Sequence, residues 1–459
     1  MPKLARGFGV VGATAIVVSN MIGTGIFTST GFLAADLGSP KLVISIWLVG
    51  GLIAMAGALC YLELAKNFPR SGGEYVYLSE AWGPAWGFIN GWVSFFAGFS
   101  APVAVAALAV SAYLGLSDEG RAFVAGPFTL RFGDARLLAV AVVGAFTLLN
   151  LLGAQQVAKL QTGLTALKLA VISSFVILGF TFGNGDVSHF TEIATRSSTL
   201  SLVEQCAVSI VFVFFGYSGW NAAVYIAEEV RDPDRTLPIA LALGTSIVTI
   251  LYVALNALFV YGASLDELNG VVAVGSTVAK SLFGDGAARG FGIAMAVSLL
   301  ASINAMCLVG PRIYYAMARN GAFLPIAGRL DPRWKTPSIA VLMQGGCSVL
   351  LILLPSFVDL VLYIGITLYL FSALSVLALF KFRRRPGWKH FSWLDRCYPL
   401  VPLVYVVMSA WVLVFSIKGA PVASARALGT VAGGALAYHL YSSRGPNRVP
   451  GVVDPMELG

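Results

Sequence analysis

"VVSNMIGTGIFTST" (residues 17–30) places two glycines around a threonine inside an apolar run whose flanks have helical character. Glycine weakens a helix, and a helix break in hydrocarbon leaves backbone N–H and C=O groups unpaired at considerable cost. Such a break is tolerated where the freed groups line a polar cavity or bind a ligand. The stretch therefore predicts a functional break in a membrane helix, and close helix packing by small residues is the alternative.

The rest of the chain is as apolar as this stretch. Of its 459 residues 58% are hydrophobic and 11% are charged, with a mean hydropathy of +0.82, which is too little charge for a soluble surface. The pattern predicts an all-α polytopic membrane protein, a single transmembrane domain over residues 1–459. About twelve spans are expected, near 8–37, 42–67, 84–114, 136–153, 157–182, 202–230, 236–263, 291–318, 338–355, 358–381, 399–418 and 421–441.

The net charge of +8 raises the question of a nucleic-acid partner. The densest basic cluster, Lys381 with Arg383, Arg384 and Arg385, directly follows the tenth expected span. With both termini in the cytoplasm, this cluster reads as a positive-inside anchor. We therefore expect a multi-pass protein of the cell (inner) membrane that binds no nucleic acid. The five cysteines lack paired spacing and are interpreted as small core residues, and no cofactor or metal is expected.

A second interruption, "FFGYSGWN" (residues 214–221), lies in the sixth expected span, five spans after the first. Two interrupted helices at corresponding positions of two halves indicate an inverted-repeat transporter. We predict a first repeat over residues 5–182, a second over 202–385, and two additional helices within 397–441.

An amino acid zwitterion suits the groups that two such breaks would free. Its carboxylate can accept from the N–H groups of Gly23, Thr24 and Gly25, at the positive end of the following half-helix. Its ammonium can donate to carbonyls, including those of Ile22 and the Phe215 region. Since no acidic residue is near either break in the sequence, a cationic side chain lacks an obvious partner, and neutral amino acids are favoured.

Several longer stretches carry a family resemblance. They are "MIGTGIFTSTGFLAADLGSP" (21–40), "GALCYLELAKNFPRSGGEYVYLSEAWG" (57–83), "TALKLA" (165–170), "FFGYSGWNAAVYIAEEVRDPDRTLPIAL" (214–241) and "PRIYYAMARNGAFLP" (311–325). Together they resemble the amino acid–polyamine–organocation superfamily, near its L-type amino acid transporter branch. The similarity covers nearly all of residues 5–385, whereas the last two expected spans are generic.

The resemblance implies a five-plus-five inverted repeat of the leucine-transporter type, with helices 1 and 6 broken, and sodium-independent amino acid transport, often by exchange. The substrate-binding residues carried over are Ile22, Gly23, Thr24 and Gly25 from the first span and Phe215, Gly216, Tyr217 and Ser218 from the sixth. Phe215 would also be an aromatic gate, and Lys168 and Tyr252 would couple binding to conformation. Animal heteromeric members carry a cysteine before the fourth span that bonds to a heavy chain. This chain has none there, so no covalent heavy-chain subunit is expected.

Lys168 is the most informative ionisable residue because it lies within the fifth expected span. It is either a permanent cation that ties the fifth span to the first break, where related transporters hold sodium, or a group that titrates and couples transport to protons. Snorkelling of the ammonium to a membrane surface is the structural alternative.

An ion-pair latch is expected at the cytoplasmic span ends, between the acids Glu63, Glu228 and Glu229 and the arginines Arg231 and Arg235. The function alternatives are a proton-coupled amino acid or polyamine symporter, a channel and a membrane enzyme. A channel requires a pore lined by repeated polar residues, and an enzyme requires clustered acids, bases or a metal set at membrane depth. The sequence shows neither pattern, so a secondary carrier is favoured.

Overall fold

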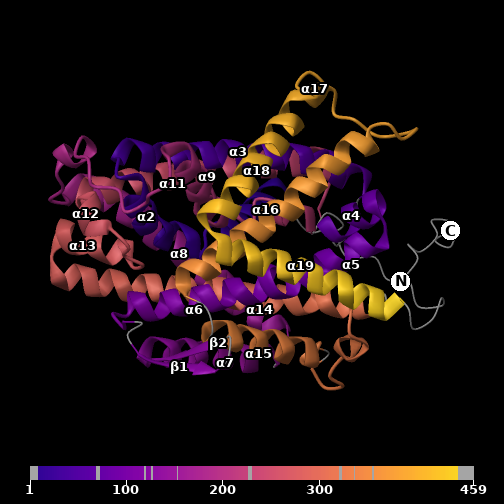
Figure 1. The fold of residues 1–459 in the computed structure, drawn as a ribbon, viewed down its shortest axis with the longest axis horizontal. Coiled ribbons are helices and arrows are strands. Elements are labelled where there is room, and N and C mark those ends of the chain that lie inside the picture. Colours follow the sequence, from indigo (N-terminus) through magenta and orange to yellow (C-terminus); the bar gives the residue numbers. More distant parts are fainter. Residues whose placement is uncertain are drawn as a thin grey trace.

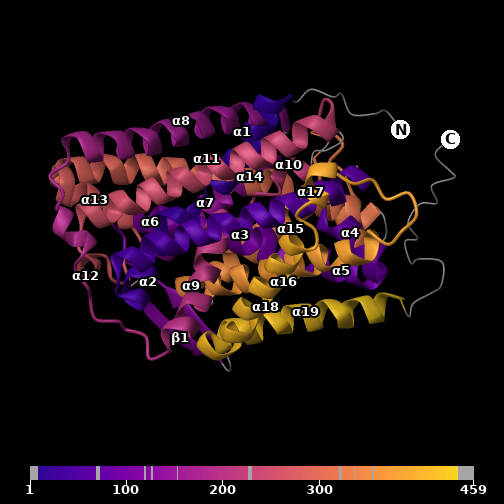
Figure 2. The ribbon, with the colours of Figure 1, turned by 90° about the horizontal axis from the view of Figure 1, so that it is seen from above.

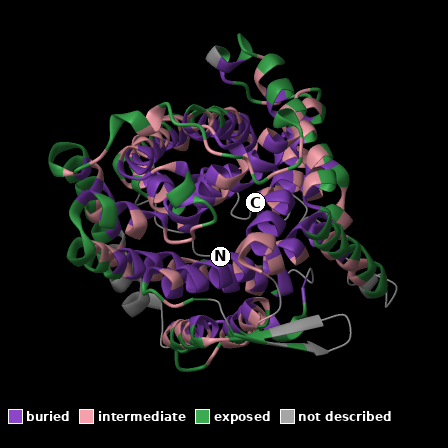
Figure 3. Cartoon of the chain, turned by 60° about the vertical axis from the view of Figure 1, so that its left-hand side comes forward, coloured by how far each residue is buried: buried purple, intermediate pink, exposed green. Residues whose placement is uncertain are grey.

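A computed structural model describes residues 9–442, apart from 69–72, 118–119, 126–127, 152–153, 226–229, 320–322, 335 and 354–355. Figures 1 and 2 show long helices running side by side along the longest axis, with α12 and α13 at one end and α4 and α10 at the other. Buried residues gather along the middle of this bundle, and exposed residues lie on its rim (Figure 3).

The first half of the chain comprises α1 (Val10–Met21), α2 (Thr24–Leu37), α3 (Pro40–Asn67), α4 (Glu74–Trp82), α5 (Pro84–Val93), the π-helical η1 (Ser94–Ser100), α6 (Ala101–Tyr113), β1 (Arg121–Ala125), β2 (Phe128–Phe132), α7 (Asp134–Leu151), α8 (Ala154–Phe182) and the 3₁₀ turn η2 (Val187–Phe190).

The second half comprises α9 (Leu202–Tyr217), α10 (Ala222–Tyr225), α11 (Pro233–Gly262), α12 (Leu265–Leu268), α13 (Val274–Phe283), α14 (Asp285–Arg319), the 3₁₀ turn η4 (Pro325–Gly328), α15 (Ser338–Leu353), α16 (Phe357–Phe382), α17 (Ser392–Asp395), α18 (Leu400–Gly419) and α19 (Pro421–Ser442). Proline opens α3, α5 and α11, where its missing N–H costs nothing and its fixed φ suits the first turn.

The predicted class, an all-α polytopic membrane protein, is confirmed. Within the described residues, seven helices are long and apolar enough to cross a membrane, and α1 with α2 forms an eighth candidate bent by 42°. Three further apolar helices are shorter: Ala166–Phe182, Leu202–Tyr217 and Ser338–Leu353. A helix or a helix pair occupies each of the twelve stretches in which a span was expected.

The loop before α7 differs from the helical expectation, because it forms a small antiparallel hairpin. Strand β1 pairs with β2 so that Arg121 lies opposite Phe132. The aromatic and β-branched residues of this loop favour strands over helix. The rings of Phe123 and Phe132 pack edge to face with centroids 5.9 Å apart. Both rings are largely exposed.

The basic cluster after α16 contacts protein and is more than a membrane-facing anchor. The ammonium of Lys381 donates to the carbonyl of Ala81 at 2.6 Å, and Arg385 donates to the carbonyl of Glu80 at 2.8 Å. Both acceptors lie in the last turn of α4, where carbonyl groups lack helical partners and attract cations. Arg383 binds a buried carboxylate, which is treated separately below.

The expectation that all cysteines are core residues holds for some of them only. Cys60 and Cys307 are buried, whereas Cys397 is exposed at the start of the connection into α18. Of the acids in the expected latch, Glu228 and Glu229 lie outside the described residues.

Two sets of helices frame the centre of the bundle. Helix α3 packs along α11 and α9, and α1 packs along α11 as well. Helix α14 packs along α6 and α8. The second half of the first span, α2, lies against α9. The two interrupted spans are therefore neighbours, which is the arrangement that a site between them requires.

Candidate functional site

The first break is confirmed, and it is shorter than the sequence suggested. Helix α1 ends at Met21 and α2 begins at Thr24, so only Ile22 and Gly23 are non-helical, with extended backbones. Thr24 and Gly25 already form the first turn of α2. The first N–H groups of a helix have no partner within it, and Gly23 caps α2 without a side-chain hydrogen bond. These amides are thus a candidate anion site.

The second break is also present, and it lies toward the end of the predicted stretch. Helix α9 continues through Tyr217, and the non-helical residues are 218–221 before α10. Ser218 is extended, and its hydroxyl donates to the carbonyl of Phe215 at 2.7 Å. Gly219 has a φ of 101°, which L-residues with a Cβ rarely adopt. The chain turns at these two residues because the Ser218 hydroxyl pairs with a carbonyl at the end of α9 and Gly219 adopts a positive φ.

The two breaks are in direct contact at Gly25. A Cβ on Gly25 would lie 2.6 Å from the backbone nitrogen of Gly216, closer than packed atoms come. Glycine at position 25 therefore permits α2 to touch α9, which is the packing role that the sequence left open as an alternative. At Gly23 a Cβ would find only the Met21 carbonyl, at 3.9 Å.

Tyr252 of α11 joins the two breaks from the side. Its hydroxyl lies 2.7 Å from the carbonyl oxygen of Met21 and 2.9 Å from that of Gly216. One hydroxyl proton serves two carbonyl acceptors, one on each interrupted span. The side chain is almost fully buried, and its ring packs edge to face against Trp47 at 5.3 Å. The tyrosine is thus placed to sense the relative position of α1 and α9.

Lys168 of α8 also contacts the first break. Its ammonium donates to the carbonyl of Ile22 at 2.6 Å and to the hydroxyl of Ser302 at 3.0 Å. The side chain is 1% exposed, so it does not snorkel to a membrane surface. Ser302 was not predicted, and its only sequence signal is a small polar residue in an apolar span. The lysine therefore ties α8, α14 and the first break together.

The predicted ammonium-binding carbonyls are already engaged. Ile22 accepts from Lys168, and a carbonyl oxygen has a second lone pair that stays available. Phe215 accepts from both the amide and the hydroxyl of Ser218, at 3.2 Å and 2.7 Å, so both of its lone pairs are used. The Phe215 ring is 5% exposed and buried against its neighbours.

One acid that the sequence placed far from both breaks is close to the second one in space. Glu74, at the start of α4, accepts from the hydroxyl of Tyr61 at 2.7 Å and from the side-chain amide of Asn221 at 3.3 Å. Burial raises the pKa of the Glu74 carboxyl above its usual range, and the hydrogen bonds from Tyr61 and Asn90 oppose that rise. The premise that no acid lies near a break is therefore wrong, because folding brings a loop acid to the sixth span.

Among the residues that the structure describes, no three His, Cys, Asp or Glu side chains come together in a way that could hold a metal ion. The breaks offer amides, carbonyls, hydroxyls and one ammonium, a set that suits a small ligand with both charges.

A family model described as amino acid permease matches residues 8–430, which is most of the chain. The chain belongs to the amino acid permease family. It falls within the amino acid–polyamine–organocation superfamily, as the sequence motifs predicted.

Among its relatives, the permease is 28% identical to the serine/threonine exchanger SteT of Bacillus subtilis, over 89% of this chain and 91% of the relative. It is 29% identical to the human large neutral amino acids transporter small subunit 2, over 95% of this chain and 80% of the relative. It is 28% identical to the mouse Asc-type amino acid transporter 1, over 91% of this chain and 78% of the relative. These relatives are transporters, which supports a non-enzymatic role for the permease.

Proposed function

We propose that this permease is a sodium-independent exchanger of neutral L-amino acids that works by alternating access. The observation that carries the proposal is the ammonium of Lys168 on the first break, bound to the Ile22 carbonyl and the Ser302 hydroxyl. A fixed cation at this point supplies the charge that a bound sodium ion would otherwise provide. The names of the relatives, a serine/threonine exchanger and a large neutral amino acids transporter among them, support the substrate class.

In this proposal the substrate carboxylate binds the amides at the start of α2, from Gly23 to Gly25. The substrate ammonium shares the remaining lone pair of the Ile22 carbonyl. Gly216, Tyr217 and Ser218 form the sixth-span side, and the ring of Phe215 closes over the bound substrate. Glu74 does not favour a cationic substrate, because its carboxylate is already bonded to Tyr61 and Asn221.

The architecture belongs to the same proposal. We propose twelve spans in a cell (inner) membrane with both termini in the cytoplasm, inverted repeats over residues 5–182 and 202–385, and two further helices within 397–441. No covalent heavy-chain subunit takes part. Residues Thr24–Gly31 are all buried, whereas Asn20 before the break is exposed. We take this asymmetry to indicate a conformation that is closed on the α2 side, which faces out of the cell.

The experiment is counterflow in proteoliposomes that contain the purified chain alone. Labelled L-serine and L-leucine should enter vesicles preloaded with unlabelled neutral amino acid, with equal rates in sodium and in choline buffer. Empty vesicles should show little uptake, and labelled L-arginine should enter slowly. Uptake that needs sodium, or that runs equally well into empty vesicles, contradicts the exchanger.

A proton-coupled symporter is the second candidate, because both atoms bound to the Lys168 ammonium are neutral oxygens. A buried lysine without a carboxylate partner can lose its proton. An inward pH gradient that drives accumulation into empty vesicles would favour this candidate over exchange.

A further inference from the structure

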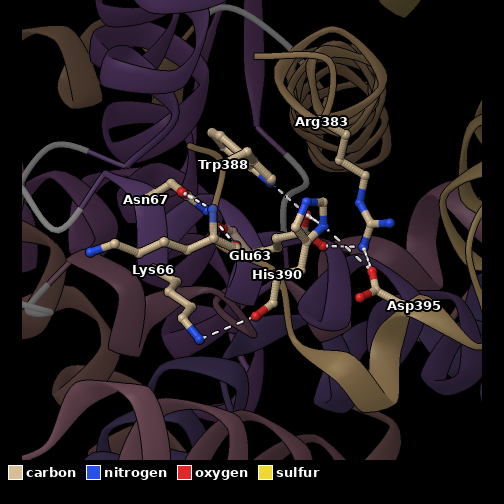
Figure 4. Close-up of polar contacts among 8 residues, drawn as sticks. Glu63, Lys66, Asn67, Arg383, Trp388, His390 and Asp395 are labelled. Carbon is tan, nitrogen blue, oxygen red and sulfur yellow. Dashed lines mark hydrogen bonds and ion pairs between the residues drawn. The ribbon is translucent and has the colours of Figure 1, made fainter. Parts of the chain in front are cut away.

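Glu63 in the last turns of α3 is fully buried, and the partners of its carboxyl group come from the far end of the chain. The guanidinium of Arg383 donates to one carboxylate oxygen at 2.5 Å, and the indole N–H of Trp388 donates to the other at 2.5 Å (Figure 4). Arg383 is the residue that follows α16, and Trp388 lies in the connection toward α17. The expected pairing of Glu63 with Arg231 or Arg235 is thus replaced by a different one.

A second layer of contacts surrounds this pair. Asp395 of α17 lies 3.0 Å from Arg383, and the Nδ1 atom of His390 lies 3.5 Å from Asp395 and 3.7 Å from Glu63. The ring of Tyr398 stacks under the guanidinium of Arg383 at 3.9 Å. Two carboxylates, one guanidinium and one imidazole therefore share a single site at the junction of α3, α16 and α17.

The backbone of the same connection is held by the end of α3. Asn67 donates to the carbonyl of Lys389 at 2.9 Å and accepts from its amide at 2.8 Å. Lys66 donates to the carbonyl of His390 at 3.3 Å and lies over the ring of Phe391 at 4.1 Å. Residues 383–395 consequently wrap the last turn of α3, and we name this arrangement the clasp.

The clasp joins α3 to the end of α16 and to α17, and α3 also packs directly on α18 and α16. Helix α3 packs on α9 and α11, which carry the second break and Tyr252. The clasp itself is continuous with α16 and α18. A buried pair such as Glu63 with Arg383 holds well in one geometry and poorly in any other, because a displaced partner leaves a buried charge uncompensated. Such a contact is suited to two discrete states.

We propose that the clasp is a conformational latch, which is closed in the state seen here and released when α3 moves with the broken spans during transport. This inference rests on the proposed alternating access. The latch holds the end of α3 against α16 and α18. Its release changes the populations of the inward-facing and outward-facing states. Glu63 and Arg383 act as positioning residues that do not touch the substrate.

The structure also contains a reporter for this release. Cys60, one helical turn before Glu63, is 1% exposed and lines a small cavity together with Glu63, Arg383 and Cys397. Opening of the clasp separates the walls of this cavity. The Cys60 thiol should then react with a maleimide at a rate that reports how often the clasp is open.

The experiment uses the full chain with Cys60 as its single cysteine, after Cys206, Cys307, Cys347 and Cys397 are changed to alanine. Removing both charges together, Glu63→Gln with Arg383→Gln, avoids an unpaired buried charge and should raise the rate of N-ethylmaleimide labelling at least roughly fivefold. A milder pair, Asp395→Asn with His390→Gln, leaves the buried pair intact and should raise the rate less. The matched control is Asp359→Asn, which breaks the 3.1 Å ion pair with Arg426 at the other end of α16 and should leave labelling unchanged.

Saturating L-serine or L-leucine should also change the labelling rate in the single-cysteine parent, since a latch responds to the transport cycle. Labelling that is the same in parent and both clasp variants overturns the latch. The labelling rate could also rise in the variants and yet stay unchanged by substrate in vesicles that carry out counterflow. That result would identify a static clasp and would also overturn the latch. If counterflow fails in the parent while substrate still shifts labelling, the exchanger is wrong and the latch stands.

Discussion

Gly23 and Gly25 are two residues apart, yet a side chain at each would meet different surroundings. A Cβ at position 25 collides with the backbone of Gly216, whereas a Cβ at position 23 has open space. The sequence treats these glycines alike as binding residues. The structure distinguishes them: α2 needs Gly25 for its packing, whereas the surroundings of Gly23 leave room for a ligand.

We expect Gly25→Ala to lower the free energy of unfolding by about 1–3 kcal/mol, because overpacking forces α2 away from α9. Gly23→Ala should keep the wild-type stability and weaken amino acid binding, since the new methyl group narrows the approach to the α2 amides. Thermal unfolding in detergent and equilibrium binding of labelled L-leucine measure the two effects. Full binding by a stable Gly23→Ala protein would argue against carboxylate recognition at this break.

Lys168 holds the first break through hydrogen bonds to a carbonyl and a hydroxyl, each worth about 1.5–3 kcal/mol when the donor is charged. Lys168→Ala should therefore reduce substrate affinity strongly and shift the permease toward one facing state. Lys280→Ala is the control, because this exposed lysine forms a surface ion pair with Asp285. If the wild type accumulates substrate under a pH gradient and the variant does not, Lys168 is a proton carrier.

Glu74 predicts a pH-dependent stability. Burial raises the pKa of this carboxyl in the folded protein, so its stabilising contribution is complete below the unfolded pKa of about 4.3 and is lost as pH rises through the folded pKa. Glu74→Gln keeps an acceptor for Tyr61 and does not titrate. The melting temperature of Glu74→Gln minus that of the wild type should therefore increase as the pH rises across this window. The exposed Glu192→Gln variant should show no such trend.

At the scale of elements, one tyrosine at the end of α6 contacts the α2 side, which we propose to be closed. The hydroxyl of Tyr113 donates to the carbonyl of Phe27 in α2 at 2.9 Å and accepts from the amide of Gly275 in α13 at 3.2 Å. One buried group thus connects α6, α2 and α13, which come from three separate parts of the sequence.

Tyr113→Phe removes this connection and leaves the Gly275 amide without its acceptor, at a cost of about 1–3 kcal/mol. We expect the variant to open more readily on the α2 side, which should raise the off-rate of bound amino acid measured by dilution. Tyr261→Phe is the matched control, since within the described residues its hydroxyl makes no hydrogen bond. Equal off-rates in both variants would mean that Tyr113 plays no part in the closure.

At the scale of the whole molecule, we expect the proposed carrier to function without a second chain. The loop before α7 has no cysteine and forms the hairpin of β1 and β2. We expect the purified chain to carry out exchange alone, and full exchange to persist after reduction with dithiothreitol. Activity that appears only when another membrane protein is co-reconstituted would contradict this.

The membrane class and both breaks followed from the sequence alone, because hydrocarbon tolerates little charge and glycine-rich polar segments stand out within apolar runs. The exact limits of the breaks did not. Thr24 and Gly25 join α2, and Phe214–Tyr217 stay in α9, because tertiary packing extends each helix up to the point where a cap or a positive φ ends it. The pairing of charges was also beyond the sequence. Glu63 binds Arg383, which is 320 residues away in the sequence. Lys168 donates a hydrogen bond to Ser302, and Glu74 accepts one from Asn221. Apolar periodicity determines which residues are buried in a span, whereas the choice of partner depends on how distant helices pack together, and only the tertiary structure decides that.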